Sequence, residues 1–163
     1  MCFCVANERL NLPPNLVVMK YPRYPIVMSD NSCVYMFFSE GPRGKIKKGV
    51  LYSRIDKNLF NLGFGDWSEG LLDLDDSNRS NNGDRDKVLI TVAHTALSFT
   101  DAFPNARIFV TGSTASRTRL YQMGIAANLL EVSQNFEVQG FVNGEWELFR
   151  PGRNYEAFLI SRK

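Results

Sequence analysis

The segment at residues 107–121 constrains the fold most, because it combines a strand, a tight turn and a helix in a fixed order. Residues 107–111 read Arg-Ile-Phe-Val-Thr, a short apolar run that is typical of a buried strand. Gly112 and Ser113 then supply turn residues, and Thr114 is a favoured residue at the start of a helix. We therefore expect a helix from about Thr114 to Ser133, with an apolar stripe at Leu120, Met123, Ala127 and Leu130.

A second amphipathic helix precedes this strand. Asp84 is expected to cap its start, and Asp86 lies in the first turn, where a negative charge favours the helix dipole. Apolar residues follow at spacings of three and four, and Pro104 ends the pattern. The predicted buried face consists of Val88, Val92, Ala96, Phe99 and Phe103. A helix, a strand and a helix in this order require at least one crossover connection.

Predicted strands lie on both sides of this central unit. Three are expected at 33–39, 45–55 and 58–64, where Gly63 and Gly65 indicate a bulge or a close approach of the backbone. A hairpin at 136–142 and 145–149, joined by Asn143-Gly144, and a strand at 155–161 follow the second helix. The predicted class is α+β, with a mixed, mostly antiparallel sheet, two helices and the order β-β-β-α-β-α-β-β-β.

Length and composition indicate one globular domain. The chain has 163 residues, 44% of them hydrophobic, and we place the domain at residues 19–163. Residues 1–18 are interpreted as a flexible tail, and the start of translation at Met1 or Met19 stays open. Three cysteines without regular spacing favour reduced thiols and a cytoplasmic location. No apolar run approaches the length of a membrane span, so no membrane association is expected.

The charge pattern excludes little. The net charge is +2, which neither requires nor rules out nucleic acid. Residues 66–83 form a long acidic loop, which resembles a calcium loop only faintly because it lacks the required Gly and Glu positions. His94 lies within the first helix without a recognisable catalytic partner. We expect no metal and no cofactor, and the aromatic residues Trp67, Trp146, Tyr21, Tyr24 and Tyr121 are interpreted as packing rather than as a base-stacking surface.

The start of the second helix is the strongest candidate for a ligand site. Free N–H groups at a helix start bind anions, and Arg117 and Arg119 place positive charges nearby, although positions two apart on a helix point about 200° apart. If both helices start at the same edge of the sheet, Asp84 and Arg85 lie near Thr114. The predicted anion-binding residues are Gly112, Ser113, Thr114, Arg117, Arg119, Asp84, Arg85 and Tyr121.

Three segments resemble a known family. Asn81-Asn-Gly-Asp-Arg-Asp-Lys-Val-Leu, Thr111-Gly-Ser-Thr-Ala-Ser-Arg-Thr-Arg-Leu-Tyr-Gln-Met-Gly and Asn154-Tyr-Glu-Ala-Phe-Leu are similar to motifs of a family of small uncharacterised proteins, mostly from Bacteroidota. The resemblance covers about residues 20–163. It implies no activity and no catalytic residue for this chain.

A second resemblance concerns the order of elements. Three antiparallel strands, helix, strand, helix and closing strands are similar to the core of the Gcn5-related acetyltransferases. In that family, the helix after the third strand cradles the pyrophosphate of acetyl-coenzyme A, and a later helix carries a Leu-Tyr-x-x-Gly-Phe pattern. Leu120-Tyr121-Gln-Met-Gly124-Ile125 is similar to this pattern. The family's Arg/Gln-x-x-Gly-x-Gly/Ala loop is missing before Asp84, where Asn82-Gly83 stands instead.

The residues leave three classes of function open, and whether the chain is an enzyme stays undecided. The first is a binding module for a phosphate-bearing small molecule at the helix starts. The second is an acyl-coenzyme A-dependent transferase. The third is an interaction or regulatory protein with an unknown protein partner, whose first candidate surface is Lys45, Lys47 and Lys48, residues that also suit an edge strand protected against aggregation.

Overall fold

The computed structural model describes residues 22–75 and 81–163, so the predicted tail at residues 1–18 lies outside the described residues. Within these ranges the strands form one sheet in the order β1-β2-β3-β4-β6-β9-β7-β8, and β5 pairs with β4. The strands are β1 (Val27–Met28), β2 (Val34–Gly41), β3 (Gly44–Asp56), β4 (Leu59–Ser68), β5 (Asp73–Asp75), β6 (Arg107–Val110), β7 (Phe136–Val142), β8 (Glu145–Leu148) and β9 (Ala157–Arg162). The helices are α1 (Arg85–Ala102), α2 (Ala115–Ala127) and α3 (Leu129–Asn135).

The predicted class is confirmed: the fold is α+β, with a mixed and mostly antiparallel sheet. The predicted number of helices and the exact order of elements are wrong. The structure adds the short strands β1 and β5 and divides the second predicted helix into α2 and α3. Asn128 is the residue at the break, and its side-chain Nδ2 donates to the carbonyl of Gly124 at 2.9 Å. A side chain that bonds to its own backbone in this way competes with the regular helical bonds.

The predicted apolar stripe of the second helix is also wrong. The Met123 side chain is 48% exposed and that of Leu130 is 86% exposed. The inward face instead carries Thr118, which is buried, and Tyr121 and Ile125, which pack against the core. This helix has few large apolar residues, and residues spaced by three and four positions can be found on several of its faces. The spacing of its apolar residues therefore does not identify the buried face.

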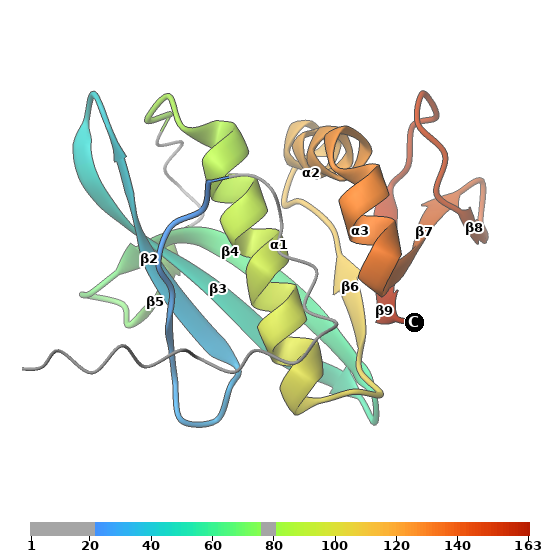
Figure 1. The fold of residues 1–163 in the computed structure, drawn as a ribbon, viewed down its shortest axis with the longest axis horizontal. Helices are drawn as coiled ribbons and strands as arrows, with labels where there is room; N and C mark the ends of the chain where they lie inside the picture. Colours follow the sequence, from blue (N-terminus) through green and yellow to red (C-terminus); the bar gives the residue numbers. More distant parts are fainter. Residues whose placement is uncertain (1–21, 76–80) are drawn as a thin grey trace, which may run out of the picture.

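The core lies between the sheet and α1. Alternate residues of the central strands are buried, as expected for strands that present one face to a helix. Phe99 of α1 is fully buried and stacks on Tyr52 with ring centroids 4.0 Å apart. The predicted α1 face is confirmed, with Val88, Val92 and Ala96 buried beside Phe99. Figure 1 shows α1 and α3 in front of the sheet and α2 across its upper edge.

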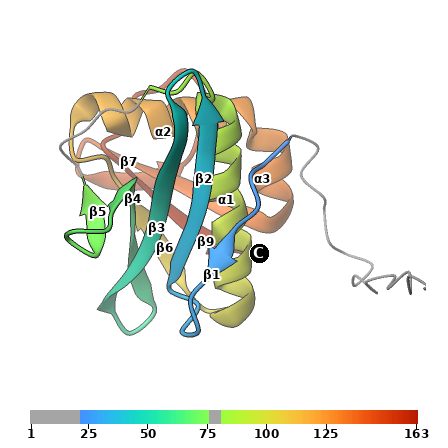
Figure 2. The ribbon, with the colours of Figure 1, turned by 90° about the vertical axis from the view of Figure 1, so that its left-hand side faces the viewer.

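Strand β4 has two different neighbours along one edge. Its first half, Leu59–Leu62, pairs in parallel with β6, whereas Asp66–Ser68 pair with β5. Figure 2 shows β5 beside β4, on the side away from β3. Leu74 of β5 packs against the backbone here, and a Cβ at Gly63 would lie 3.2 Å from its Cδ1. The close approach expected at Gly63 is therefore present. Strand β5 covers the part of the β4 edge that does not pair with β6.

Candidate functional site

The β4–β6 pair is the one parallel pairing among the described strands, and it is short. The pairing ends at Leu62 and Val110, after which β4 continues to Ser68 while β6 turns into α2. Ligands of sheets with parallel strands commonly bind beyond the carboxyl ends of those strands, where neighbouring strands lead to different sides. The end of the β4–β6 pairing is therefore the strongest candidate position for a ligand site.

The turn after β6 delivers α2 with a fully formed cap. The Thr114 Oγ1 accepts from the N–H of Arg117 at 3.3 Å, which confirms Thr114 as the N-cap residue. The N–H of Gly112 donates to the Thr118 hydroxyl at 2.9 Å, which ties the turn to the helix. A Cβ at Gly112 would lie 2.4 Å from the backbone nitrogen of Thr118, so no larger residue fits this turn.

Arg117 and Arg119 have different surroundings. Arg117 is half-buried, and its Nη1 donates to the Ser113 hydroxyl at 2.6 Å, so its guanidinium lies over the start of α2. Arg119 is exposed and two positions further along the helix. Helical geometry places it on a different side from Arg117. Of the two arginines, only Arg117 is held at the start of α2 by a hydrogen bond between described residues.

Tyr121 lies deeper, in a narrow apolar cleft between α1 and α2. The cleft has a volume of about 90 Å³ and reaches Leu62 and Val110, the last paired residues of β4 and β6. Gly124 and Ile125 of α2 line it together with Tyr121. The lining is almost wholly apolar, so the cleft suits a slender apolar chain rather than a charged group.

The start of α1 is built differently from the start of α2. Asp84 is the N-cap residue, but its side chain makes no capping bond, which corrects the expected role. The carboxylate instead accepts hydrogen bonds from the hydroxyls of Tyr24 and Ser39, both at 2.6 Å. Asn82 is buried beside it and donates to Ser39 and to the carbonyl of Gly44. This network joins α1 to the β2–β3 hairpin.

The network determines the protonation state of Asp84. Burial acts to raise the pKa of Asp84, but the hydrogen bonds from Ser39 and Tyr24 and the nearby charge of Lys48 outweigh it. The pKa therefore lies below its ordinary value, and Asp84 is a carboxylate at neutral pH. Burial and the same carboxylate raise the pKa of the Tyr24 hydroxyl, which agrees with Tyr24 acting as the donor.

A buried ion pair that the sequence pattern does not predict lies next to this network. Lys48 of β3 pairs with Asp66 of β4, and the two side chains are 8% and 16% exposed. Of the three lysines predicted to form an exposed basic surface, only Lys45 is largely exposed, with 72% of its side chain accessible, whereas Lys47 is 30% exposed. β3 is a central strand, so the edge-strand interpretation of these lysines is wrong. Residues two positions apart on a strand lie on the same face of the sheet, so the apolar Val50 is the signal in the sequence that Lys48 points inward.

Both helices begin at the same edge of the sheet, as Figure 1 shows. Arg85 is exposed and pairs with its neighbour Asp86 at 3.7 Å. Within the described ranges, no hydrogen bond or ion pair connects residues 84–85 with residues 112–119. The two predicted halves of the site therefore share an edge of the sheet.

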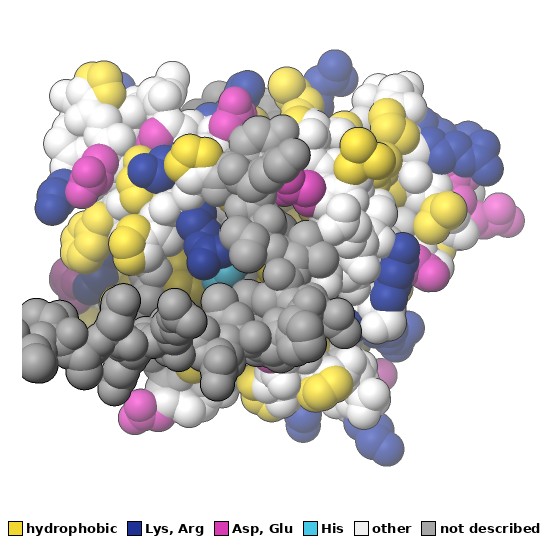
Figure 3. All heavy atoms as spheres, in the orientation of Figure 1, with side chains coloured by type: hydrophobic (Ala, Val, Ile, Leu, Met, Phe, Trp, Pro, Cys, Tyr) yellow, Lys and Arg dark blue, Asp and Glu magenta, His cyan; other side chains and the backbone are white. Residues whose placement is uncertain are grey.

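The helix-covered face carries mixed chemistry. On the described part of this face, Figure 3 shows Lys and Arg side chains interspersed with acidic and apolar ones rather than gathered into one patch. Nucleic-acid backbones are recognised by continuous basic stripes. Tyr24 is buried, and Trp146 packs on Phe141 and Phe109 while remaining 41% exposed. Tyr21 lies outside the described residues.

Neither a metal cluster nor a membrane helix occurs in the described residues. No group of three or more His, Cys, Asp or Glu side chains among residues 22–75 and 81–163 is arranged to hold a metal ion. In the same ranges, none of the helices combines the length and the apolar character that crossing a bilayer requires.

Comparison with known proteins gives a family and no function. A model described as a family of unknown function, DUF6934, matches residues 20–163. The chain therefore belongs to the DUF6934 family, which confirms the predicted membership of a family of uncharacterised proteins over about residues 20–163. The match bears neither on an origin in Bacteroidota nor on the likeness to the Gcn5-related acetyltransferases. No curated protein matches the chain. No solved structure matches it either.

Proposed function

We propose that the chain binds a phosphate-bearing small molecule at the start of α2, where β4 and β6 part. The observation that carries this proposal is the end of the parallel pairing at Leu62 and Val110, directly before the turn that starts α2. The turn aims the first N–H groups of the helix, those of Ala115 and Ser116, outward without an acceptor inside the helix. A phosphate fits such a position through hydrogen bonds and the helix dipole.

The side chains at this turn suit a phosphate as well. Ser113 and Thr114 are exposed hydroxyl residues, and Arg117 is oriented over the turn by its bond to Ser113. A guanidinium offers two parallel N–H donors to a phosphate, which a lysine cannot do. Ligand binding would bring the Arg117 guanidinium onto phosphate oxygens beside the exposed Ser113 hydroxyl.

A thermal-shift screen of the full chain tests the proposal. The panel consists of nucleotides, sugar phosphates, coenzyme A derivatives and short oligonucleotides. A ligand at a hundred times its dissociation constant stabilises by about 2.7 kcal/mol, which raises the melting temperature by roughly 5–10 °C for a domain of this size. We expect R117A to abolish this shift and R119A, the matched control on another side of α2, to keep it.

The outcomes are distinct. If a ligand raises the melting temperature of R117A as much as that of the wild type, the ligand binds elsewhere than at the start of α2. If no ligand of the panel raises the melting temperature, phosphate binding is rejected and a protein partner becomes the favoured alternative.

We further infer a more specific ligand, an acyl-coenzyme A, as the second candidate. The narrow apolar cleft beside the proposed phosphate site favours it, because a thin carbon chain attached to a phosphate would fill the space along Tyr121, Gly124 and Ile125. The order of β2, β3, β4, α1, β6 and α2 is similar to that of the Gcn5-related acetyltransferases. The absent glycine loop before Asp84 leaves the phosphate to be held at α2 rather than at α1.

A cleft-filling variant separates the two candidates. I125W places a large side chain in the cleft, and M123W adds the same side chain on the exposed side of α2, where Met123 is 48% exposed. If coenzyme A is the ligand, I125W reduces the stabilisation by coenzyme A to that by ADP, and M123W does not. Equal stabilisation by coenzyme A and ADP in the wild type rejects this second candidate.

A further inference from the structure

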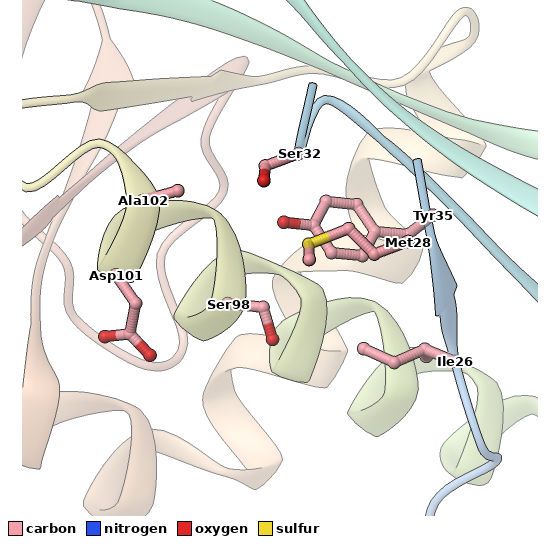
Figure 4. A pocket seen from close by; sticks show the side chains of 7 residues that line it. All are labelled: Ile26, Met28, Ser32, Tyr35, Ser98, Asp101 and Ala102. Atoms are coloured by element: carbon pink, nitrogen blue, oxygen red, sulfur yellow. The ribbon is translucent and has the colours of Figure 1, made fainter. Parts of the chain in front are cut away.

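A larger pocket lies at the opposite end of α1 from the proposed phosphate site. Its volume is about 460 Å³, within the range of small-molecule sites. The walls are the turn between β1 and β2 on one side and the last turns of α1 on the other (Figure 4). The lining side chains include Ile26, Met28, Ser32, Tyr35, Ser98 and Asp101.

The Tyr35 hydroxyl is the unusual group in this pocket. Tyr35 is fully buried, and its hydroxyl has no hydrogen-bond partner among residues 22–75 and 81–163. Figure 4 shows this hydroxyl pointing from β2 toward α1, into the space bounded by Ser32, Ser98 and Met28. Burial raises the pKa of Tyr35 to about 12, so the group is a neutral hydroxyl at physiological pH. Buried hydroxyls almost always have a partner, and a ligand group in this pocket would supply one.

Asp101 and the C-terminal end of α1 place negative charge near this pocket. Asp101 is the charged residue in the described lining, and its carboxylate pairs with Arg162 at 3.1 Å while remaining 59% exposed. The last turn of α1 contains no basic residue, so the negative end of the helix dipole is uncompensated from within the helix. The hydroxyls of Ser32, Ser98 and Tyr35 add oxygen acceptors. Acceptor oxygens beside a carboxylate favour a ligand with N–H donors and a positive charge.

The opposite wall is apolar. Ile26 and Met28 line it, so a ligand needs a carbon chain as well as its charged group. The adjoining turn is held by the bonds of Asn31 Oδ1 with Ser29 and Cys33. Ser32 there has a φ of 58°, a left-handed conformation, and it lines the pocket.

We propose that this pocket binds a small primary amine. Its ammonium group donates hydrogen bonds to the hydroxyl oxygens of Tyr35 and Ser98, and Asp101 supplies the compensating negative charge. Its carbon chain lies against Ile26 and Met28. The site is independent of the proposed phosphate site, since it lies on other residues and at the other end of α1.

The test titrates the full chain with three five-carbon probes and measures the chemical shifts of the backbone amides by NMR. The probes are n-pentylamine, 1-pentanol and pentanoate. We expect saturable shifts for the amine at residues 26–35 and 98–102. The alcohol binds about tenfold more weakly because it lacks the charge, which corresponds to about 1.4 kcal/mol. Pentanoate causes no shift at these residues.

Two variants and a control complete the test. Y35F removes one hydroxyl and D101N removes the charge without changing the shape, and each weakens the amine at least about fivefold. D86N is the control, because Asp86 is also an exposed carboxylate of α1 paired with an arginine, but lies in its first turn. Equal binding of amine and alcohol, or amine binding that D101N leaves unchanged, overturns the proposal. D101N keeps the test valid if Y35F folds poorly, because Asp101 is a surface residue.

Discussion

The Asp84 network makes a prediction that can be worked out in magnitude. The carboxylate accepts two hydrogen bonds of 2.6 Å, within the range of strong bonds between a hydroxyl and a carboxylate. Hydrogen bonds to charged groups contribute about 1.5–3 kcal/mol each, and the two bonds share one acceptor oxygen. D84A should therefore lower the free energy of unfolding by about 3 kcal/mol at pH 7. D84N keeps one neutral acceptor and should cost about half as much.

The pH dependence of this effect has a definite sign. The pKa of Asp84 is lowered in the folded chain, so its contribution to stability is fully present above the unfolded pKa of about 3.9. The contribution is lost as the pH falls through the folded pKa. The difference between wild type and D84N should therefore shrink on acidification from pH 7 to pH 3.

Urea unfolding at both pH values measures the effect, with D86N as the matched control. Asp86 lies in the same first turn, but its side chain is 88% exposed and pairs only with Arg85 in the described part of the chain, so D86N should cost less than about 0.5 kcal/mol. A double-mutant cycle of D84N with Y24F should give a coupling of about 1 kcal/mol or more. A cost for D84N that equals that of D86N, or that stays constant with pH, would refute this account of the network.

Three further perturbations follow from the packing. G112A should cost about 1–3 kcal/mol in urea unfolding, because the added Cβ would lie 2.4 Å from the Thr118 backbone nitrogen; an unchanged midpoint would contradict this. F99A should cost about 3–5 kcal/mol, since Phe99 is fully buried and stacked on Tyr52, and a cost below 1 kcal/mol would mean that the core is packed differently. Burial and the charge of Arg23 lower the pKa of His94, so the wild type should lose stability as the pH falls below 6.5, and H94Q should flatten this dependence in melting curves between pH 7 and 5.

The sequence predicted the elements that have strong periodicity or clear turn residues. The face of α1 and the hairpin at Asn143-Gly144 are confirmed, because Val88 to Phe99 repeat at helical spacing and Asn-Gly adopts positive φ readily. The predicted apolar stripe of α2 is wrong because that helix is half-exposed and its inward face includes the polar Thr118. Strand β5 was not predicted because its Leu74 packs against Gly49 and Gly63 of other strands, and such contacts between distant segments leave no local pattern.

The candidate site was predictable in part. Thr114 and Gly112 follow local rules of helix starts, so their roles in the α2 turn are as expected. Asp84 follows the same local rules, yet its side chain bonds to Tyr24 and Ser39, which lie 60 and 45 residues away. The burial of Lys48 likewise depends on the place of β3 within the sheet. Long-range partners of this kind carry no local pattern in the chain.

The most direct test of phosphate binding at the start of α2 is an NMR titration of the full chain with inorganic pyrophosphate. The account predicts that the largest amide shifts occur at Ala115, Ser116 and Arg117, and that R117A removes them while R119A does not. Residues 85–86 at the start of α1 should shift little, because Arg85 already pairs with Asp86 and the carboxylate of Asp86 disfavours a phosphate there. The absence of saturable shifts at residues 112–117, or larger shifts at the start of α1, would contradict the proposed site.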